Sequence, residues 1–241
     1  MRFCMLQDWL MSSQYTVVFT GAGMSTESGL PDFRSSNNGL WRKNNSSQIA
    51  STKALNENVK EFTAFYRERV LGVKEFGPHK GHYILAKWEQ QGIIRSIITQ
   101  NVDGFHQEAG SKRVAELHGT LQKVHCQSCG REYSSENYVN KDFYCECGGV
   151  LRPNIVLFGE ALPQEAFQFA VEETEKADLF IVLGSSLSVT PANQLPLIAK
   201  GNNAKLVIVN TEPTLYDKFA DQVIHDKKIG ELLTELDEKI Q

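Results

Sequence analysis

The stretch "VVFTGAGMSTESGLPDFRSS", Val17 to Ser36, leads from β-branched and aromatic residues into glycines, hydroxyls and then a proline, an acid and an arginine. A buried strand, the glycine turn at residues 21–23 and a helix start would present backbone N–H groups to a ligand, and glycines let a pyrophosphate come close. As a dinucleotide fingerprint the spacing is incomplete, because Thr26 stands where a third glycine would be. A tight strand-to-helix connection is the alternative. The polar side chains that follow exceed what such a connection needs and favour a binding turn.

Strand-like runs of large apolar and β-branched residues recur along the chain and alternate with helical patterns. The runs lie at residues 15–20, 93–99, 179–183 and 205–209, and the helical patterns at 81–91, 163–176 and 229–240. This alternation predicts an α/β fold, a doubly wound parallel sheet with helices on both faces.

Two segments break that rhythm. Residues 35–77 open with a Ser/Asn-rich stretch and continue into an amphipathic helix, and residues 119–153 carry cysteines but few long apolar elements. The apolar face of that helix would carry Leu55, Val59, Phe62, Tyr66 and Val70. We expect both segments to form a smaller domain above the carboxyl edge of the sheet, with residues 1–34, 78–118 and 154–241 forming the main domain.

Composition excludes several classes of protein. The formal charge is −4, from 25 Lys and Arg against 29 Asp and Glu, and no basic block occurs, so we expect no direct nucleic-acid binding. No apolar run approaches the roughly 20 residues that a membrane-spanning helix needs. Gln7 and Asp8 interrupt the apolar N-terminus, which argues against a secretory signal. We expect a cytoplasmic protein with no membrane association; the oligomeric state stays open, with a monomer as the default.

Four of the five cysteines follow a metal-binding pattern. The spacing is Cys126-x2-Cys129-x15-Cys145-x-Cys147, whose second pair is C-x-C rather than the commoner C-x-x-C. Four thiolates fill a tetrahedral zinc site and leave no position for a reactive water. The pattern therefore predicts one structural zinc, with Cys4 standing apart.

Several motifs, in order along most of the chain, resemble the sirtuin family of NAD-dependent protein deacylases. They are "GAGMSTESGLPDFR" (21–34), "TQNVDGFHQEAG" (99–110), "ELHG" (116–119), the four cysteines, "PNIVLFGE" (153–160), "GSSLSV" (184–189) and "VIVN" (207–210). The resemblance implies a Rossmann-like NAD-binding domain, and a small domain made of a zinc ribbon and the helical insertion. The active site would lie in the cleft between them, beyond the carboxyl ends of the strands.

The resemblance also implies a reaction that consumes NAD as a co-substrate. The acyl oxygen of an acyl-lysine attacks the anomeric carbon of the nicotinamide ribose, nicotinamide leaves, and a general base activates a ribose hydroxyl. The products are free lysine, nicotinamide and O-acyl-ADP-ribose. His118 matches the family's base, a role that suits an imidazole because it titrates near neutrality. Asn101, with Gln100, would position the ribose and the reacting water.

Further cofactor contacts follow from the resemblance alone. Val102 and Asp103 would hold the nicotinamide carboxamide, and Phe33 would wall off its pocket. The remaining predicted contacts to phosphates, ribose and adenosine are Ala22, Thr26, Arg34, Ser185, Ser186, Asn210 and, through its backbone, Lys228.

The partner implied is an acyl-lysine protein or peptide. It would add a strand to "IVLFGE" (155–160), with Val156 and Phe158 lining the acyl-lysine tunnel. Tyr66 and Arg69, three residues apart on the amphipathic helix, are similar to the Y-x-x-R pair of sirtuins that prefer malonyl- or succinyl-lysine. Such a pair grips the acyl carboxylate through charge-assisted hydrogen bonds. The alternative, in which Tyr66 packs in the helical module and Arg69 is a solvated charge, is equally open.

Deacetylation is the default activity under this interpretation. Mono-ADP-ribosyltransfer, in which a protein nucleophile traps the same ribosyl centre, is an alternative. A catalytically silent module that binds NAD or ADP-ribose is a third. A dehydrogenase is disfavoured, because no pocket for a hydride-accepting substrate is legible.

Overall fold

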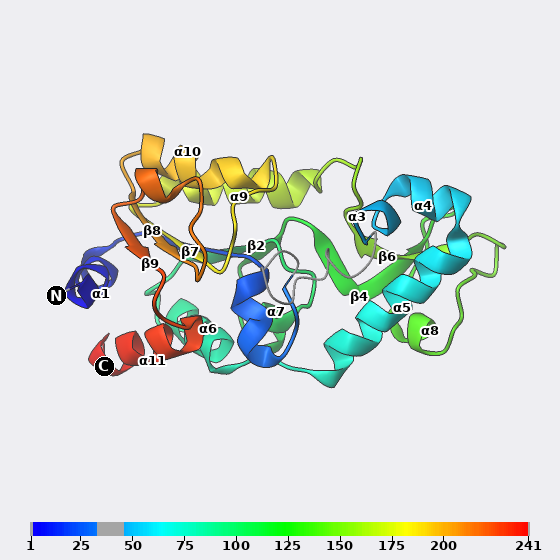
Figure 1. Cartoon of the computed structure of the whole chain (residues 1–241), viewed down its shortest axis with the longest axis horizontal. Helices are drawn as coiled ribbons and strands as arrows, with labels where there is room; N and C mark the ends of the chain where they lie inside the picture. Colours follow the sequence, from blue (N-terminus) through cyan, green and yellow to red (C-terminus); the bar gives the residue numbers. More distant parts are fainter. Residues whose placement is uncertain (1, 33–45, 241) are drawn as a thin grey trace.

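In a computed structural model of the chain, residues 2–32 and 46–240 are described. A six-stranded parallel sheet in the order β3-β2-β1-β7-β8-β9 forms the larger part of the molecule (Figure 1). Its strands are β1 (Thr16–Thr20), β2 (Ser96–Thr99), β3 (Val114–Glu116), β7 (Leu179–Leu183), β8 (Lys205–Val209) and β9 (Gln222–Ile224). This confirms the predicted α/β fold class.

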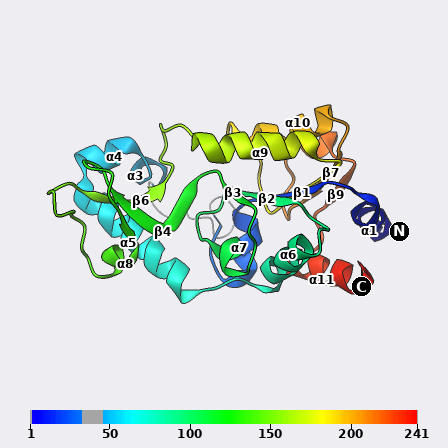
Figure 2. The ribbon, with the colours of Figure 1, turned by 180° about the vertical axis from the view of Figure 1, so that it is seen from behind.

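Helices cover both faces of the sheet, which is why its central strands β1 and β7 are buried along their whole length (Figures 1 and 2). The helices α1 (Arg2–Ser12), α6 (Lys80–Gln90) and α11 (Ile229–Ile240) pack on one face, and α9 (Gln164–Lys176) and α10 (Leu195–Gly201) on the other. Leu232, Leu233 and Leu236 form the buried stripe of α11 that its sequence pattern predicts.

The structure corrects some predicted boundaries. The strand expected at residues 93–99 begins only at Ser96, because the backbone N–H groups of Ile93 and Ile94 donate to the carbonyl of Trp88 and close the end of α6. The short strands β3 and β9 and the helix α1 carry too little periodicity to be predicted from the sequence.

A small module lies beyond the carboxyl ends of the sheet strands (Figure 1). It contains α3 (Ser46–Ile49), α4 (Thr52–Glu57), α5 (Val59–Glu75), α8 (Glu136–Val139) and an antiparallel sheet, in the order β5-β4-β6, of β4 (Gly119–Cys126), β5 (Glu132–Ser134) and β6 (Leu151–Ile155). The amphipathic helix predicted as one element is two, because Asn58 ends α4 and caps α5: its side chain accepts from the N–H of Glu61 at 3.4 Å. Phe62, Tyr66 and Val70 of α5 pack in one core with Leu121 and Val124 of β4.

Short elements complete the fold around the strand ends. They are η1 (Ala22–Ser28), α7 (Phe105–Glu108), η2 (Ala192–Gln194) and η3 (Asp217–Phe219). Within residues 2–32 and 46–240, no helix has the length and apolar character that crossing a bilayer requires.

Candidate functional site

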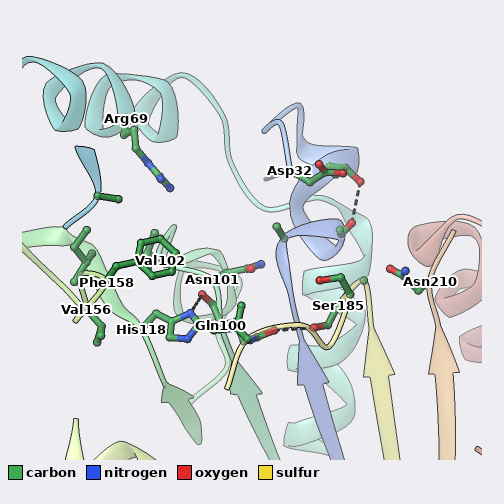
Figure 3. A pocket seen from close by; sticks show the side chains of 18 of the residues that line it. Asp32, Arg69, Gln100, Asn101, Val102, His118, Val156, Phe158, Ser185 and Asn210 are labelled. Atoms are coloured by element: carbon green, nitrogen blue, oxygen red, sulfur yellow. Dashed lines mark hydrogen bonds between the residues drawn. The ribbon is translucent and has the colours of Figure 1, made fainter. Parts of the chain in front are cut away.

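A cavity of about 610 Å³ lies between the carboxyl ends of the sheet strands and the small module (Figure 3). Loops after β1, β2, β7 and β8 form one wall, and α5 with the segment after β6 forms the other. The structure brings most of the predicted site residues together in this lining: Ala22, Thr26, Tyr66, Arg69, Gln100, Asn101, Val102, His118, Val156, Phe158, Ser185, Ser186, Asn210 and Lys228. Phe33 and Arg34 lie outside the described residues.

The glycine turn packs directly against the loop that follows β7. The N–H of Gly23 donates to the carbonyl of Gly184 at 2.9 Å, and a Cβ on Gly23 would lie 2.7 Å from the Cα of Gly184. Gly184 itself has φ +65°, which favours glycine. Backbone packing therefore already requires these glycines, and the same turn places Ala22 and Thr26 at the cavity surface.

A chain of polar groups lies behind the loop that follows β2. The side-chain amide of Asn101 donates to Ser25 Oγ at 3.2 Å, and Ser25 Oγ donates to Asp103 Oδ2 at 2.7 Å. Asp103 also accepts the N–H of Phe105 at 3.0 Å. Burial raises the pKa of Asp103, while the hydrogen bonds from Phe105 and Ser25 oppose the shift. Sequence reasoning missed Ser25 as the link between the two predicted residues.

Asp103 differs from the other described cofactor residues in its position. Its side chain is buried, and it is not part of the cavity lining, whereas its neighbour Val102 is. The structure therefore places the carboxylate behind the cavity wall, where it orients Ser25.

His118 lies at the step between β3 and β4 and faces the cavity (Figure 3). Its Nδ1 is 3.0 Å from the carbonyl oxygen of Gln100, which can only accept, so Nδ1 carries the proton and the neutral ring has its lone pair on Nε2. The carbonyl of His118 accepts the N–H of Val156 at 2.9 Å. One residue is thus fixed both to the loop after β2 and to the predicted substrate strand.

Polar side chains join the loops at the cofactor end of the cavity. Ser185 Oγ donates to Gln100 Oε1 at 2.7 Å and so connects the loops after β7 and β2 (Figure 3). The Asn210 amide donates to the carbonyl of Glu212 at 2.6 Å, which orders the loop after β8. These loops present hydroxyl and amide groups of the kind that bind ribose and phosphate.

The opposite wall continues from β6. Phe158 is 47% exposed in the cavity, and its N–H donates to the carbonyl of Ala50 at 2.9 Å. Arg152 and Glu160 support this segment through two parallel hydrogen bonds of 2.6 and 2.8 Å. Burial raises the pKa of Glu160, but the hydrogen bonds from Arg152 and from the N–H of Leu157, together with the positive charge of Arg152, outweigh this effect and lower the pKa overall. This supporting ion pair was not predicted, because nothing in the sequence sets it apart from surface charges.

Tyr66 and Arg69 reach the cavity from α5, and Arg69 points into it (Figure 3). Tyr66 is buried in the small-module core, and burial raises its pKa to about 12 against the opposing charges of Arg69 and Arg152. Burial also lowers the pKa of Arg69. The charges of Tyr66 and Asp103 act in the opposite direction and raise it. Arg69 is therefore a cation that faces the cavity, whereas Tyr66 both packs in the core of the small module and lines the cavity.

The four cysteines converge away from the cavity, in the small module. Their sulfurs all lie within 4.8 Å of one another, with Cys126 and Cys147 at 3.5 Å and Cys129 and Cys145 at 3.7 Å. A tetrahedron with zinc–sulfur bonds of about 2.3 Å has edges of about 3.8 Å. Gly149 makes room for the sulfurs, because a Cβ there would lie 2.5 Å from Cys126 Sγ. The donor set fits a structural zinc.

Comparison with known proteins identifies a family over most of the chain. A family model described as the Sir2 family matches residues 21–191. An NAD-dependent protein deacetylase of Oceanobacillus iheyensis is 70% identical over 229 residues, covering 95% of this chain and 97% of the relative. The NAD-dependent protein deacetylase 1 of Geobacillus kaustophilus is 58% identical over 235 residues, covering 98% and 97%.

Solved structures agree with these relatives. A Sir2 bound to acetylated peptide superimposes with a TM-score of 0.90 at 37% identity, covering 100% of both chains. A Sir2 with a p53 peptide and NAD+ gives a TM-score of 0.91 at 38% identity, covering 99% of this chain and 98% of the other. The similarity therefore includes both the large sheet and the small module.

Proposed function

The chain belongs to the Sir2 family, and on this premise we propose that it is an NAD-dependent protein deacetylase that frees lysine in the cavity between sheet and small module. The observation that carries the proposal is the position of His118. It stands between the cofactor loops and the substrate strand, with its tautomer set by the Gln100 carbonyl. A base held in this way has the lone pair of Nε2 directed away from Gln100, which is the orientation that proton transfer through Nε2 requires.

The reaction divides between the two walls. The acyl oxygen attacks the anomeric carbon of the nicotinamide ribose, the glycosidic C–N bond breaks, and its electron pair leaves with nicotinamide. His118 Nε2 then takes the proton of a ribose hydroxyl as that oxygen attacks the acyl carbon. The bond from the acyl carbon to the lysine nitrogen breaks, and the amine leaves with a proton. Water then adds to the acyl carbon, and the bond from this carbon to the anomeric oxygen breaks, so that the products are free lysine and O-acyl-ADP-ribose. Asn101 and Gln100, which flank the reacting centre, orient the ribose and this water.

The other site residues take the roles that their positions support. Ala22 and Thr26, with Ser185, Ser186 and Asn210, would hold the phosphates and adenosine side, and Lys228 would contact adenine through its backbone. Val102 would meet the carboxamide at the cavity surface, and Asp103 would act on it from behind, together with Ser25 and Asn101. The roles of Phe33 and Arg34 stay predictions from the sequence.

The substrate is an acylated lysine in an extended peptide segment. It would pair with the backbone after β6, with Val156 and Phe158 lining the lysine channel. The exposed ring of Phe158 supports this, since an aromatic surface in a cavity suits an alkyl side chain. We also propose that residues 35–77 and 119–153 form a small domain of their own, because side chains from both segments pack in one separate core.

A second candidate activity concerns the acyl group. Arg69 in the cavity wall favours a preference for malonyl or succinyl groups, because a half-buried guanidinium attracts a carboxylate strongly. The test compares acetyl- and succinyl-lysine versions of one peptide with the wild type and Arg69→Met. A succinyl preference that collapses in the variant would establish it; wild-type turnover confined to the acetyl peptide would refute it.

A cytoplasmic location is also part of this proposal. The four clustered thiols would be kept for a metal rather than oxidised to disulfides, a use of cysteine that is typical of reducing compartments.

The order of steps gives a direct test of His118. Because nicotinamide leaves before the base acts, His118→Ala should lose deacetylation by about a hundredfold or more while still exchanging labelled nicotinamide into NAD in the presence of acetyl peptide. Exchange activity also reports that the variant folds and binds both substrates. Equal loss of both activities in a folded variant would remove His118 from the role of base, and full deacetylation would overturn the proposal.

A further inference from the structure

Three histidines lie together beneath the site, outside the cavity lining. His79 and His82, at the start of α6, have ring centroids 4.5 Å apart, and the rings of His82 and His106, from α7, are 4.9 Å apart. His82 and His106 are no more than 1% exposed. Nothing in the reaction above uses them.

Hydrogen bonds fix the tautomer of each buried ring. The N–H of His79 donates to His82 Nδ1 at 3.2 Å, so a neutral His82 carries its proton on Nε2. His106 Nε2 lies 3.0 Å from Thr20 Oγ1, whose single proton is already donated to Thr99 Oγ1 at 2.8 Å. His106 must therefore donate from Nε2, which leaves the lone pair on Nδ1.

The two remaining ring atoms are complementary. His82 Nε2, a donor, and His106 Nδ1, an acceptor, are both buried, and neither has a hydrogen-bond partner within the part of the chain that is described. Burying an unpaired polar atom costs about 1–3 kcal/mol. An unpaired donor and an unpaired acceptor on neighbouring rings therefore favour pairing with each other. The ring centroids are 4.9 Å apart, a separation that a ring rotation or one shared water can bridge.

We propose that His82 and His106 are positioning residues that complete a hydrogen-bond chain from α6 to the active-site loop, in the order His79 N–H, His82, His106, Thr20 and Thr99. Thr99 Oγ1, where the chain ends, also accepts the backbone N–H of Asn101 at 3.0 Å. The role assigned here to Asn101 rests on the proposed function.

The hydrogen-bond chain holds in place the loop after β2, which carries Gln100 and Asn101. Thr99 fixes the backbone of Asn101, while Ser25 fixes its side chain, so the amide has two independent anchors. Gln100, between them, supplies the carbonyl that sets the His118 tautomer. A loop loosened at Thr99 would therefore misplace both the ribose contact and the base, and small misplacements of catalytic groups reduce rate steeply.

Both imidazoles have to be neutral for this chain. A second proton on His106 would place an N–H opposite that of His82, so that two donors would face each other. Burial, together with neighbouring histidines, lowers the pKa of His82 to about 2 and that of His106 to about 3, in agreement with a neutral pair.

A nuclear magnetic resonance experiment tests the hydrogen-bond chain without reference to activity. Long-range ¹H–¹⁵N spectra of the ¹⁵N-labelled full chain, assigned with His82→Gln and His106→Gln, report which ring nitrogen carries the proton. The expected result is the Nε2–H tautomer for both rings at neutral pH. A protonated Nδ1 on His106, or a doubly protonated ring, would overturn the proposal.

A kinetic experiment tests the consequence. Thr20→Val keeps the side-chain shape and removes the hydroxyl link, Thr20→Ser restores it, and Thr174→Val is the matched control. Thr174 is also fully buried, and its hydroxyl donates to the carbonyl of Ala170 far from the cavity. We expect kcat for acetyl peptide to fall about tenfold in Thr20→Val, with the peptide KM unchanged, and to recover in Thr20→Ser.

The controls separate the possible failures. A kcat of Thr20→Val equal to that of Thr174→Val, at similar thermal stability, would overturn the positioning role. A wild-type protein without deacetylase activity would refute the proposed function instead, and the tautomers would then decide whether the chain exists.

Discussion

Gly119 forms the backbone turn that directly follows His118. It follows the histidine with φ +75°, and a Cβ at this residue would lie 2.1 Å from the carbonyl oxygen of Asn154 on β6. The backbone at this step can therefore turn from β3 into β4 only with glycine, and the histidine is placed by the turn that follows it.

Gly119→Ala should both destabilise the protein and lower its activity. Gly92→Ala is a matched control, because Gly92 has the same φ of +75° and a methyl group added there would meet no atom within 4 Å. We expect the control to cost about 1 kcal/mol in unfolding free energy and Gly119→Ala to cost at least about 2 kcal/mol more, with loss of deacetylation. Denaturant unfolding and peptide turnover measure both, and equal effects of the two substitutions would contradict the argument.

At the residue scale, the sequence predicted the groups that line the cavity better than the groups that support them. Asn101 and His118 stand in recognisable motifs, and the structure brings both to one cavity. Ser25, Arg152 and His106 act through partners that the fold supplies, such as Ser25 on Asp103, 78 positions away. Contacts between residues so far apart leave no local sequence pattern. For the same reason the burial of Asp103 could not be predicted from the sequence.

At the scale of elements, long periodic segments were predictable and short ones were not. The stripe of α11 gave its bounds, Ile229–Ile240, because twelve residues repeat one face three times. The three-residue strands β3 and β9 hold their place through neighbours in the sheet, which no periodicity records. The division of α4 from α5 depends on one capping side chain, that of Asn58.

The zinc site lies in the same module as the wall that would bind the peptide. Removing zinc with a chelator should loosen β4 and β6, and the substrate wall at residues 156–158 continues directly from β6, whereas the cofactor turn belongs to the large sheet. We expect acyl-peptide affinity to weaken by at least about tenfold, which is about 1.4 kcal/mol, while NAD affinity changes little. Calorimetric titration of each ligand measures this, and added zinc should restore peptide binding. Peptide affinity that survives complete metal removal would disprove the coupling.

For the whole molecule, the buried histidine pair predicts acid sensitivity. In the unfolded chain each imidazole takes up a proton near its ordinary pKa of 6.5, whereas the folded pKa is lowered to about 2 for His82 and about 3 for His106. Below pH 6.5 the unfolded state binds more protons, so the free energy of unfolding falls as the pH falls. The raised pKa of buried Asp103 acts in the opposite sense, because that carboxyl holds a proton more readily when folded.

The expected loss is about 2 kcal/mol per histidine between pH 6.5 and pH 5. Denaturant unfolding at several pH values measures it, with His106→Gln as the comparison, since glutamine does not titrate and should remove the contribution of one histidine from the slope. A slope that is identical in the variant would show that the loss arises elsewhere.

Both halves of the molecule act on one reaction, in which NAD is consumed to free lysine. The most direct measurement counts nicotinamide released and lysine freed, in the same tube, from NAD and one acetyl-lysine peptide. We expect a ratio of one to one, with the acetyl group recovered on ADP-ribose. Nicotinamide released without freed lysine would indicate ADP-ribosyl transfer, and no release of nicotinamide would indicate a silent binding module; either result would rule out deacetylation as the reaction.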